Sequence, residues 1–573
     1  MAGKAKPGFY IAIFVVIAAL VGLAIWRFGA KGDDKKNEQQ EDIKLPNQGG
    51  DTAEAPDTSD LTTVKEYEFV PSEKLPPVKE TSSYKKMENN TVKFAINVWA
   101  GWAPIVHANG GFAPGKVWKT PKGKEFRVQL VLIDDPVAMR DAFAQGDVHI
   151  GWATVDMLPI LVEGLAKDSR TMPRVFQQID WSNGGDGIVS REGIKNVGEL
   201  KGKTIVLAQN SPSHYFALNA LLNAGVQPRE VNFKFTKDAF QAAAAYVADK
   251  KIAAAVSWAP DIYKISEAKG NKLLVSTETA NKLIADVWFA RADFARDHKD
   301  IVEGITRGIF DSMELLKDDT EKDKVAAWMG KGYDMPAKEA REMLGDAHWT
   351  NYAENRQFFL NSNNPTNFER TYETAAYLYQ KIRVIDKEVP FDQIVDFSII
   401  KKLGKEKKYA DQKDEYSVRF TPAAASTVQA ESEEILTKTV KIHFYPNSYD
   451  LEKKVTRKIN GKDKEVLYDP SAPEVVKEVG KLAGQYGAAR IVIEGHTDSS
   501  MKGKVPPELV KELSMNRANA VKGALLKRFE LEPNQFSVQG KGWERPQDSN
   551  QPGNHALNRR VEVKVYPLEA VPE

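Results

Sequence analysis

Residues 489–498 read ARIVIEGHTD, an apolar run that ends in a polar cluster. The β-branched residues inside the run favour a strand, and Thr497 and Asp498 then fall at its carboxyl end. The spacing of apolar residues predicts one helix before this strand, at 473–486, and another after it, with Ser514 as its N-cap. Further strands are predicted at 440–448, 536–542 and 558–563.

Four motifs in a fixed order surround this stretch. They are GHTD at 495–498, LSMNRA at 513–518, GKG at 540–542 and NRRVE at 558–562. Together they resemble the OmpA-like peptidoglycan-binding domain, and the likeness covers about residues 439–567. The resemblance implies an α/β domain that holds the diaminopimelate side chain of the peptidoglycan stem peptide.

The same resemblance implies roles for single residues of the peptidoglycan site. Asp498 is expected to pair with an ammonium group of the ligand, and Arg517 with a carboxylate. A carboxylate and a bidentate guanidinium suit a zwitterionic ligand, because each recognises one of its charges. Asn447, Thr497 and Arg559 match further positions of the family pattern and are expected to complete the hydrogen bonding.

Residues 91–403 alternate short apolar runs with amphipathic stretches. Continuous apolar runs are typical of buried parallel strands, and their alternation with helices indicates a second α/β fold. Ligands of such folds lie at the carboxyl ends of the strands. The predicted strands are 92–100, 126–133, 149–153, 203–208 and 253–259, with helices between them, as at 136–144 and 213–224.

Two long segments of this region carry a second resemblance. IKNVGELKGKTIVLA (194–208) and SPSHYFALNALLNAG (211–225) resemble the nitrate, sulfonate and taurine type of ABC-transporter solute-binding proteins, as do QGDVHIG (145–151) and AAAVSWAP (253–260). The resemblance implies a two-lobed, type II periplasmic-binding-protein fold. Residues 187–284 would form one lobe, the rest of 91–403 the other, and the ligand would lie between them.

The predicted solute site follows from that resemblance. Members of the family mostly bind small oxyanions and related organic solutes, so an oxyanion or an organic anion is the expected ligand. A helix that begins near Pro212 would favour an anion at its N-terminus, with simple capping by serine as the alternative. Asp186 and Asp261 are weaker candidates for this site. The expected solute-binding residues are Trp99, Gly101, Trp102, Trp152, Ser211, Ser213 and Trp258.

Composition excludes several other functions. The chain has 80 Lys+Arg, 79 Asp+Glu and no cysteine, which gives no support to nucleic acid as a partner and excludes cysteine-based chemistry. Some thiamine-precursor synthases share the two-lobed fold but use a cysteine-rich iron motif, so that enzyme is excluded. The stretch GGFAPGKV (110–117) lacks the Ser/Thr of a Walker A motif, and the histidines form no HExxH. We therefore expect a protein that is not an enzyme, with no catalytic residue, metal or cofactor.

Residues 9–26 read FYIAIFVVIAALVGLAIW, a run without charge. Eighteen residues at about 1.5 Å each are long enough to cross a bilayer core. The run is longer than the apolar part of most signal peptides and no good cleavage site follows, which favours a retained single-pass anchor within 1–31. The remaining segments are predicted as a disordered linker at 32–90, a second linker at 404–438 and a tail at 568–573.

Peptidoglycan lies outside the cytoplasmic membrane, so the C-terminal resemblance indicates the orientation of the chain. We expect an inner-membrane, single-pass protein whose bulk lies in the periplasm. It would bind peptidoglycan and a small solute, as a fixed receptor, a sensor or a transport component. The alternative is a stator-like or scaffold component of a membrane complex tethered to the cell wall, with a membrane-protein partner and a middle domain that serves protein interaction. Stator subunits use an intramembrane carboxylate, which 9–26 lacks.

Overall fold

The computed structural model describes Glu54 and residues 67–568, all within the second of two compact units, 45–573. The predicted membrane helix at 9–26 lies outside the described residues, as do most of the predicted 568–573 tail and the first part of the 32–90 linker. Among the described helices, none is both long and apolar enough to cross a bilayer.

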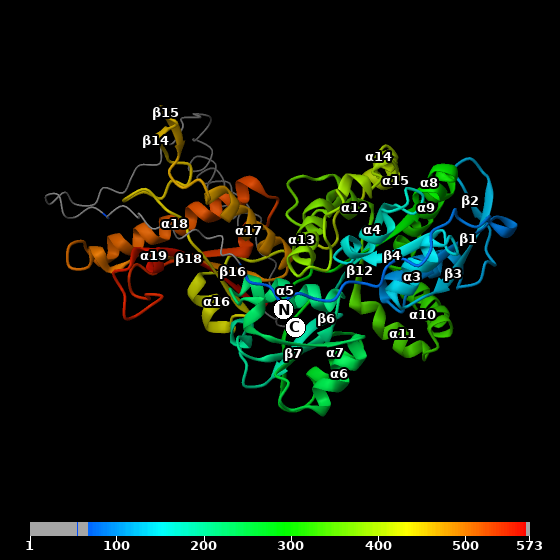
Figure 1. Cartoon of the computed structure of the whole chain (residues 1–573), viewed down its shortest axis with the longest axis horizontal. Coiled ribbons are helices and arrows are strands. Elements are labelled where there is room, and N and C mark those ends of the chain that lie inside the picture. The colour runs from blue at the N-terminus through cyan, green and yellow to red at the C-terminus, as the bar shows by residue number, and fades with distance from the viewer. Residues whose placement is uncertain (1–53, 55–66, 569–573) are drawn as a thin grey trace, which may run out of the picture. The chain divides into compact units, whose positions relative to one another are not determined.

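The first sheet of the middle region has seven strands in the order β12-β5-β11-β4-β1-β3-β2 (Figure 1). β1 pairs in parallel with β3 and β4, as predicted for these apolar runs. β11 runs antiparallel between β4 and β5, neither β5 nor β11 having been predicted. The strands are β1 (Thr91–Ile96), β2 (Trp118–Lys119), β3 (Glu125–Leu132), β4 (Ile150–Thr154), β5 (Pro173–Ser182), β11 (Ala285–Arg291) and β12 (Ala347–Trp349).

A second sheet has five strands in the order β10-β6-β9-β7-β8. β7 pairs in parallel with β8 and β9, and β6 and β10 are antiparallel additions at one side. Two α/β sheets built from one region confirm the periplasmic-binding-protein type of fold. The strands are β6 (Asp186–Arg191), β7 (Thr204–Ala208), β8 (Asn232–Thr236), β9 (Ala254–Trp258) and β10 (Asn271–Ser276).

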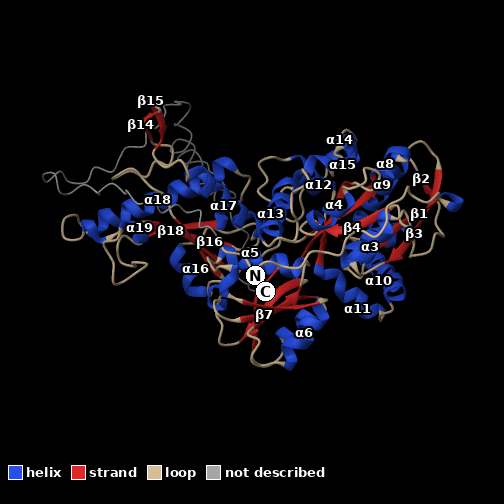
Figure 2. Ribbon diagram, in the orientation of Figure 1, coloured by secondary structure: helices blue, strands red, loops and turns tan. Residues whose placement is uncertain are grey.

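Helices surround both sheets (Figure 2). The N-terminus of α3 shows why one begins where it does: Asp135 accepts hydrogen bonds from the N–H groups of Val137 and Ala138, and Pro136 takes the first helical position. The α-helices of this region are α2 (Ala103–Asn109), α3 (Pro136–Ala144), α4 (Leu158–Leu165), α5 (Pro212–Asn223), α6 (Ala239–Ala248), α7 (Asp261–Ser266), α8 (Ala292–Asp297), α9 (Lys299–Leu315), α10 (Asp319–Tyr333), α11 (Ala337–Met343), α12 (Tyr352–Leu360), α13 (Phe368–Lys381) and α14 (Ser398–Leu403). The 3-10 helices are η1 (Glu88–Asn90), η2 (Ala100–Trp102), η3 (Val197–Leu200), η4 (Pro228–Glu230), η5 (Leu344–Asp346) and η6 (Phe391–Gln393).

The described part of the first predicted linker, 67–90, is an ordered extended segment instead of a disordered one. The N–H of Ser82 donates to the carbonyl of Ala144 at 3.1 Å, and that of Lys85 donates to the carbonyl of Gly146 at 3.0 Å. Backbone hydrogen bonds to a folded surface order a chain that lacks apolar periodicity, which is why the sequence pattern missed it.

The C-terminal region contains a four-stranded sheet in the order β13-β18-β16-β17. Its strands are β13 (Leu436–Val440), β16 (Arg490–His496), β17 (Phe536–Gly540) and β18 (Arg560–Tyr566), with a separate hairpin of β14 (Lys454–Ile459) and β15 (Lys462–Leu467). Its helices are α17 (Ala472–Gln485), η7 (Ser499–Met501), α18 (Pro507–Arg528), η8 (Pro533–Gln535) and α19 (His555–Asn558).

Ser514 does not cap a helix, contrary to the sequence prediction. α18 begins at Pro507, and Ser514 lies in its interior, where its hydroxyl donates to the carbonyl of Lys511 at 2.8 Å. The same hydroxyl accepts from the N–H of Gly542 at 3.0 Å. Ser514 therefore fixes α18 to the loop after β17.

The predicted linker at 404–438 also has ordered contacts. It contains α15 (Lys407–Ala410) and α16 (Ala425–Glu431), and Phe420 is buried. Arg490 on β16 donates to the carbonyl of Thr421 at 2.6 Å. Half of this segment therefore packs on the C-terminal sheet, because its few apolar side chains find partners there.

Candidate functional site

Four elements of the C-terminal region bring charged side chains into one buried pocket. Asp498 follows β16, Arg517 lies in the middle of α18, and Arg559 immediately precedes β18. Their exposed fractions are 0%, 3% and 7%. Asn447 lies in a turn with a φ of 58°, a left-handed conformation that asparagine tolerates. Four of the five residues predicted for the peptidoglycan site thus meet around one pocket.

A carboxylate from the same chain fills this pocket. Glu54, only 1% exposed, accepts from both terminal nitrogens of Arg517, with the Nη1–Oε1 distance at 2.9 Å. The N–H of Asn447 donates to Glu54 Oε2 at 3.1 Å, and the N–H of Glu54 donates to Asn447 Oδ1 at 3.1 Å. Arg559 Nε lies 3.3 Å from Glu54 Oε1. The pocket is therefore built to grip a carboxylate.

Asp498 forms the other side of the pocket. One of its oxygens accepts from Arg559 Nε, and the other accepts from the N–H of Ser500 at 2.7 Å. His555 Nδ1 lies 2.9 Å from Asp498 Oδ2. Burial alone would raise the pKa of Asp498, but Arg559 and Ser500 outweigh it and lower that pKa to about 2. Asp498 is thus a fixed negative charge beside a carboxylate-binding arginine.

Thr497, the fifth predicted residue, is buried at the end of the same strand. Its N–H donates to the carbonyl of Gly542 at 2.8 Å, while its hydroxyl has no hydrogen-bond partner among the described residues. Sequence reasoning missed Glu54 and His555. Glu54 lies in a segment without apolar pattern, and no local signal connects it to a pocket more than 390 residues away.

A nearby group of three potential metal ligands is an ion-pair network instead of a metal site. Within the described part of the chain, Glu494, His496 and Glu562 have ligand atoms within 4.8 Å of one another. Lys541 and Lys564 each lie 3.2 Å from an oxygen of Glu494. These two cations already neutralise the charge that would attract a metal ion.

The structure does not gather the seven residues predicted for the solute site into one group: two tryptophans lie in the hydrophobic core and the two serines lie at the start of α5. Trp102 and Trp152 pack in the hydrophobic core, with their Nε1 groups donating to Asn97 Oδ1 and the Ile133 carbonyl. Ser211 holds the N-cap position of α5, but its hydroxyl donates to the carbonyl of Ala208 at 2.8 Å and caps nothing. Ser213 is buried, and its hydroxyl has no partner among the described residues.

Trp99, Gly101 and Trp258 adjoin buried carboxyl groups. Trp99 Nε1 donates to Asp180 Oδ2 at 2.9 Å. A Cβ added to Gly101 would lie 1.6 Å from that same oxygen, so only glycine leaves room for the carboxylate. Trp258 lies opposite Asp186 in the β6–β9 pair. The weaker candidate Asp261 instead makes a surface pair with Lys264 at 3.5 Å.

These carboxyl groups belong to a larger set, which we call the carboxyl cluster. In the β11 pairings, Asp286 lies opposite Asp180 on one side and Thr154 on the other. The carboxyl of Asp186 accepts from Ser182 at 2.7 Å, and that of Asp346 accepts from Tyr263 at 2.5 Å. All are at most 8% exposed. The carboxyl cluster consists of Asp156, Asp180, Asp186, Asp286 and Asp346.

Burial raises the pKa of every carboxyl group in the cluster. The pKa is raised to about 7 for Asp156, Asp180 and Asp186 and to about 6 for Asp346. Burial and then the charge of Asp180 raise the pKa of Asp286 well above its usual range. The charge of Asp186 also raises the pKa of Asp156, and the charge of Asp346 raises that of Asp186.

Among the described residues 91–403, no buried Lys or Arg side chain pairs with this cluster, and His348, which acts on Asp180, lies 3.0 Å from Glu354. The two buried guanidinium groups there belong to Arg140 and Arg291, which pair with Asp141 at 2.8 Å and Asp293 at 2.9 Å. Desolvation lowers the pKa of the buried His149 and of His214, which favours their neutral forms. An arrangement of this kind attracts positive charge, whereas an oxyanion site needs buried donors or cations.

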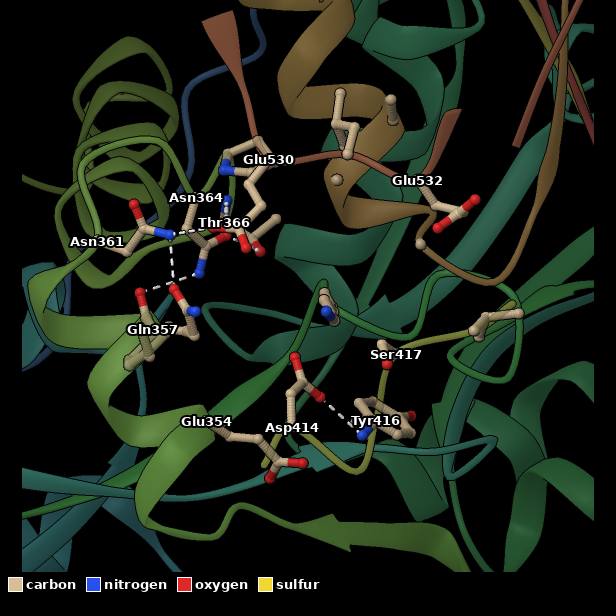
Figure 3. Close-up of a pocket in the computed structure, with 18 of the residues that line it drawn as sticks. Glu354, Gln357, Asn361, Asn364, Thr366, Asp414, Tyr416, Ser417, Glu530 and Glu532 are labelled. Carbon is tan, nitrogen blue, oxygen red and sulfur yellow. Dashed lines mark hydrogen bonds between the residues drawn. The ribbon is translucent and has the colours of Figure 1, made fainter. Parts of the chain in front are cut away.

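A separate pocket, drawn in Figure 3, contains none of the predicted solute-binding residues. Asn361 donates to Gln357 Oε1 and to Glu530 Oε2, both at 2.5 Å, and the N–H of Tyr416 donates to Asp414 Oδ1 at 2.8 Å. Its polar side chains are thus largely satisfied by one another. Unlike the carboxyl cluster, this pocket therefore has, among its described residues, no group of unpaired buried side chains that would bind a ligand.

Comparisons with known proteins agree with both regions. Residues 461–560 match the OmpA family, and residues 122–329 match the family described as "ABC transporter, phosphonate, periplasmic substrate-binding protein". Outer membrane protein Omp38 of Acinetobacter baumannii is 37% identical over 100 residues, which are 17% of this chain and 27% of Omp38. The taurine-binding periplasmic protein of Escherichia coli is 28% identical over 184 residues, which are 32% of this chain and 55% of that protein.

Among solved structures, the periplasmic aliphatic sulphonate binding protein SsuA from Escherichia coli is similar with a TM-score of 0.42 and 16% sequence identity. The likeness covers 59% of this chain and 98% of SsuA. The chain spans 27% of the length of Omp38 and 55% of the taurine-binding protein, so it shares one domain with each.

The chain therefore carries two binding domains of periplasmic type. An OmpA domain stands at its C-terminal end, and an ABC-type periplasmic binding domain of the phosphonate and sulfonate type precedes it.

Proposed function

We propose that this protein is an inner-membrane-anchored periplasmic receptor that binds peptidoglycan with its C-terminal domain and a small solute with its middle domain. It acts as a fixed receptor or sensor, because a chain held at the membrane and at the cell wall cannot carry a solute far. We propose a binding role without catalysis, which rests on the two binding domains described above.

The observation that carries the wall-binding role is the grip of Arg517 on the Glu54 carboxylate. The guanidinium makes a two-pronged contact, the geometry that arginine uses for planar carboxylates. Asp498 and Arg517 are connected through Arg559, which contacts both Asp498 and Glu54. A ligand with one carboxylate and one neighbouring ammonium, as in the diaminopimelate side chain, fits both sides of this pocket.

Sedimentation with purified sacculi tests this proposal. Asp498→Ala and Arg517→Ala should each reduce co-sedimentation of the chain to background. The matched controls are Asp463→Ala and Arg457→Ala, which change exposed residues of the β14–β15 hairpin and should leave co-sedimentation unchanged. Binding that persists in both pocket variants would refute the assignment of this site.

A further inference from the structure

We propose that the middle domain binds a small organic solute that carries protonated nitrogens, through the carboxyl cluster. This inference rests on the proposed solute-binding function and specifies the chemical class of the solute. It differs from the oxyanion or organic anion that the sequence resemblance favours.

Several buried polar groups in and beside the carboxyl cluster have no hydrogen-bond partner among the described residues. Neither carboxylate oxygen of Asp156 has a hydrogen bond of normal geometry within the described residues, although Thr154 lies beside it. The hydroxyl of Tyr215 is also without a partner of normal geometry, although the side chain of Asn219 lies beside it. Asp156 and Tyr215 are 1% and 0% exposed. Buried acceptors of this kind normally have a donor, and an ammonium group supplies up to three.

Tyr215 and Tyr379 both reach the carbonyl of Ser211, whose oxygen accepts from the N–H of Tyr215 at 3.1 Å. Burial raises the pKa of both tyrosines, and the negative charge of Asp156 raises each of them further. The Tyr379 hydroxyl donates to the carbonyl of Ser211 at 3.4 Å, which places the start of α5 beside this group. A charge on Asp156 thus meets tyrosine hydroxyls and other carboxyl groups but no cation. A cation bound here would stabilise the charged forms of these buried groups.

The spacing of the carboxyl groups favours an organic cation over a metal ion. In the described part of the chain, three ligand atoms come within 4.8 Å of one another at Glu494, His496 and Glu562, and nowhere in the carboxyl cluster. The cluster is therefore too spread out to surround one ion. An organic solute with two or more nitrogens can pair with several separate carboxyl groups at once.

Aromatic side chains complete an environment for such a ligand. Trp99 donates to Asp180, and Tyr263 donates to Asp346. The outer edge of the Trp99 ring lies close to Gly185: a Cβ added to Gly185 would be 2.6 Å from the Cη2 atom of Trp99. Aromatic rings beside carboxylates attract ammonium groups, because the ring face carries negative charge.

Isothermal titration calorimetry of the full-length chain at pH 7 tests the ligand class. The probes are putrescine and spermidine as organic cations, and ethanesulfonate and methylphosphonate as anions. We expect the cations to bind and to release protons, seen as a heat that changes with the ionisation enthalpy of the buffer, because a bound cation lowers the raised pKa values of the cluster. Asp156→Asn and Asp186→Asn should each weaken binding by roughly 30-fold or more, the effect of removing one partner of a buried charge pair.

The control variant is Asp261→Asn, whose carboxylate lies outside the cluster and should leave binding unchanged. Anion binding that survives Asp156→Asn would overturn the cation inference while leaving the solute-binding function intact. If none of the four probes binds, both the inference and the proposed solute-binding function are contradicted.

A separate observation supports a second inference: we propose that Glu54 is an internal competitor for the peptidoglycan ligand. Its carboxylate uses both terminal nitrogens of Arg517 and the N–H of Asn447. A carboxylate of an external ligand needs these same donors, so the two cannot occupy the pocket together. Peptidoglycan binding then requires Glu54 to leave.

The sacculi assay with Glu54→Gln and Glu54→Ala tests this competition. Both variants should bind sacculi about tenfold more tightly, the factor expected if Glu54 fills the pocket in about nine of ten molecules. Glu68→Gln, which removes an exposed carboxylate paired with Arg229, serves as the control and should bind like the parent chain. Unchanged or weaker binding by both Glu54 variants would overturn the competition. Loss of all binding, in the parent chain as well, would instead refute the proposed wall-binding function.

Discussion

Glu54 and Arg517 form a buried ion pair although 463 positions separate them in the sequence. Their side chains are 0% and 4% exposed, and Asn447 closes the contact by exchanging two hydrogen bonds with Glu54. A segment that precedes the middle domain thus reaches a pocket of the last domain. Access of any other carboxylate to the donors of this pocket is therefore tied to the position of Glu54.

The acid groups of this pocket should make the C-terminal domain sensitive to low pH. Both Glu54 and Asp498 have a lowered pKa: burial would raise it, but Arg517 acts on Glu54 and Arg559 on Asp498. A carboxyl group whose pKa is lowered on folding stabilises the folded state at pH values above its ordinary pKa. This stability is lost as the pH falls through the pKa that the group has in the folded state. For Asp498, a change from 3.8 to about 2 corresponds to about 2 kcal/mol. Urea unfolding between pH 5 and pH 2 should show this loss.

Asp498→Asn provides the matched measurement. It should remove about 2 kcal/mol of the difference in unfolding free energy between pH 5 and pH 2. Asp463→Asn, on the exposed hairpin, should preserve the full difference. An unchanged pH dependence in Asp498→Asn would contradict the ionised, paired state of this carboxylate.

The middle domain should show the opposite dependence on pH. Burial raises the pKa of Asp156 to about 7, so the folded state holds a proton there that the unfolded state releases above about pH 4. The stability that comes from a raised pKa is present at low pH, and it is lost as the pH rises through the pKa that the group has in the folded state. Thermal unfolding without ligand should therefore give a lower Tm at pH 8 than at pH 5, with a contribution of about 3 kcal/mol from Asp156 between these two pH values.

Asp156→Asn removes the titrating group while keeping the size of the side chain. The Tm of this variant should depend less on pH between 5 and 8 than that of the parent chain. The groups that act on Asp156 include Thr154 and Asp186, so Asp186→Asn should also reduce the dependence. A parent chain whose Tm rises between pH 5 and pH 8 would show that the cluster is not protonated in the folded state.

The sequence predicted the parallel strands well, because they are continuous apolar runs such as KTIVLA at 203–208, which contains β7. It missed β5, which reads PRVFQQIDWS, and β11, because polar residues interrupt their apolar pattern. One of the interrupting residues in each strand, Asp180 in β5 and Asp286 in β11, belongs to the carboxyl cluster, so missing these strands also meant missing part of the cluster. Motif resemblance found Arg517 and Asp498, whereas Glu54 could not be found, because only the folded chain brings it to them.

Gly101 should be intolerant of any side chain. A Cβ at this position would lie 1.6 Å from Asp180 Oδ2 and 2.8 Å from the Trp99 ring, so Gly101→Ala must displace the buried carboxylate. We expect a loss of about 1–3 kcal/mol in unfolding free energy, the usual cost of overpacking, together with weaker solute binding. Gly193→Ala, which has nothing within 4 Å of the added Cβ, is the control for urea unfolding. Equal stability of the two variants would contradict the close approach of Asp180 to Gly101.

Two glycines of the C-terminal domain should respond to alanine in opposite directions. Gly495 on β16 lies against α18, and its Cβ would be 1.9 Å from the carbonyl oxygen of Ser514. Backbone cannot yield as a flexible side chain does, so Gly495→Ala should cost about 3 kcal/mol or more and reduce sacculi binding, since α18 carries Arg517.

Gly523, inside α18, has nothing within 4 Å of an added Cβ. Gly523→Ala should stabilise the domain by about 1 kcal/mol, because alanine is the better helix former. Urea unfolding of both variants checks these signs, and a destabilised Gly523→Ala or a neutral Gly495→Ala would contradict the packing of α18 on β16.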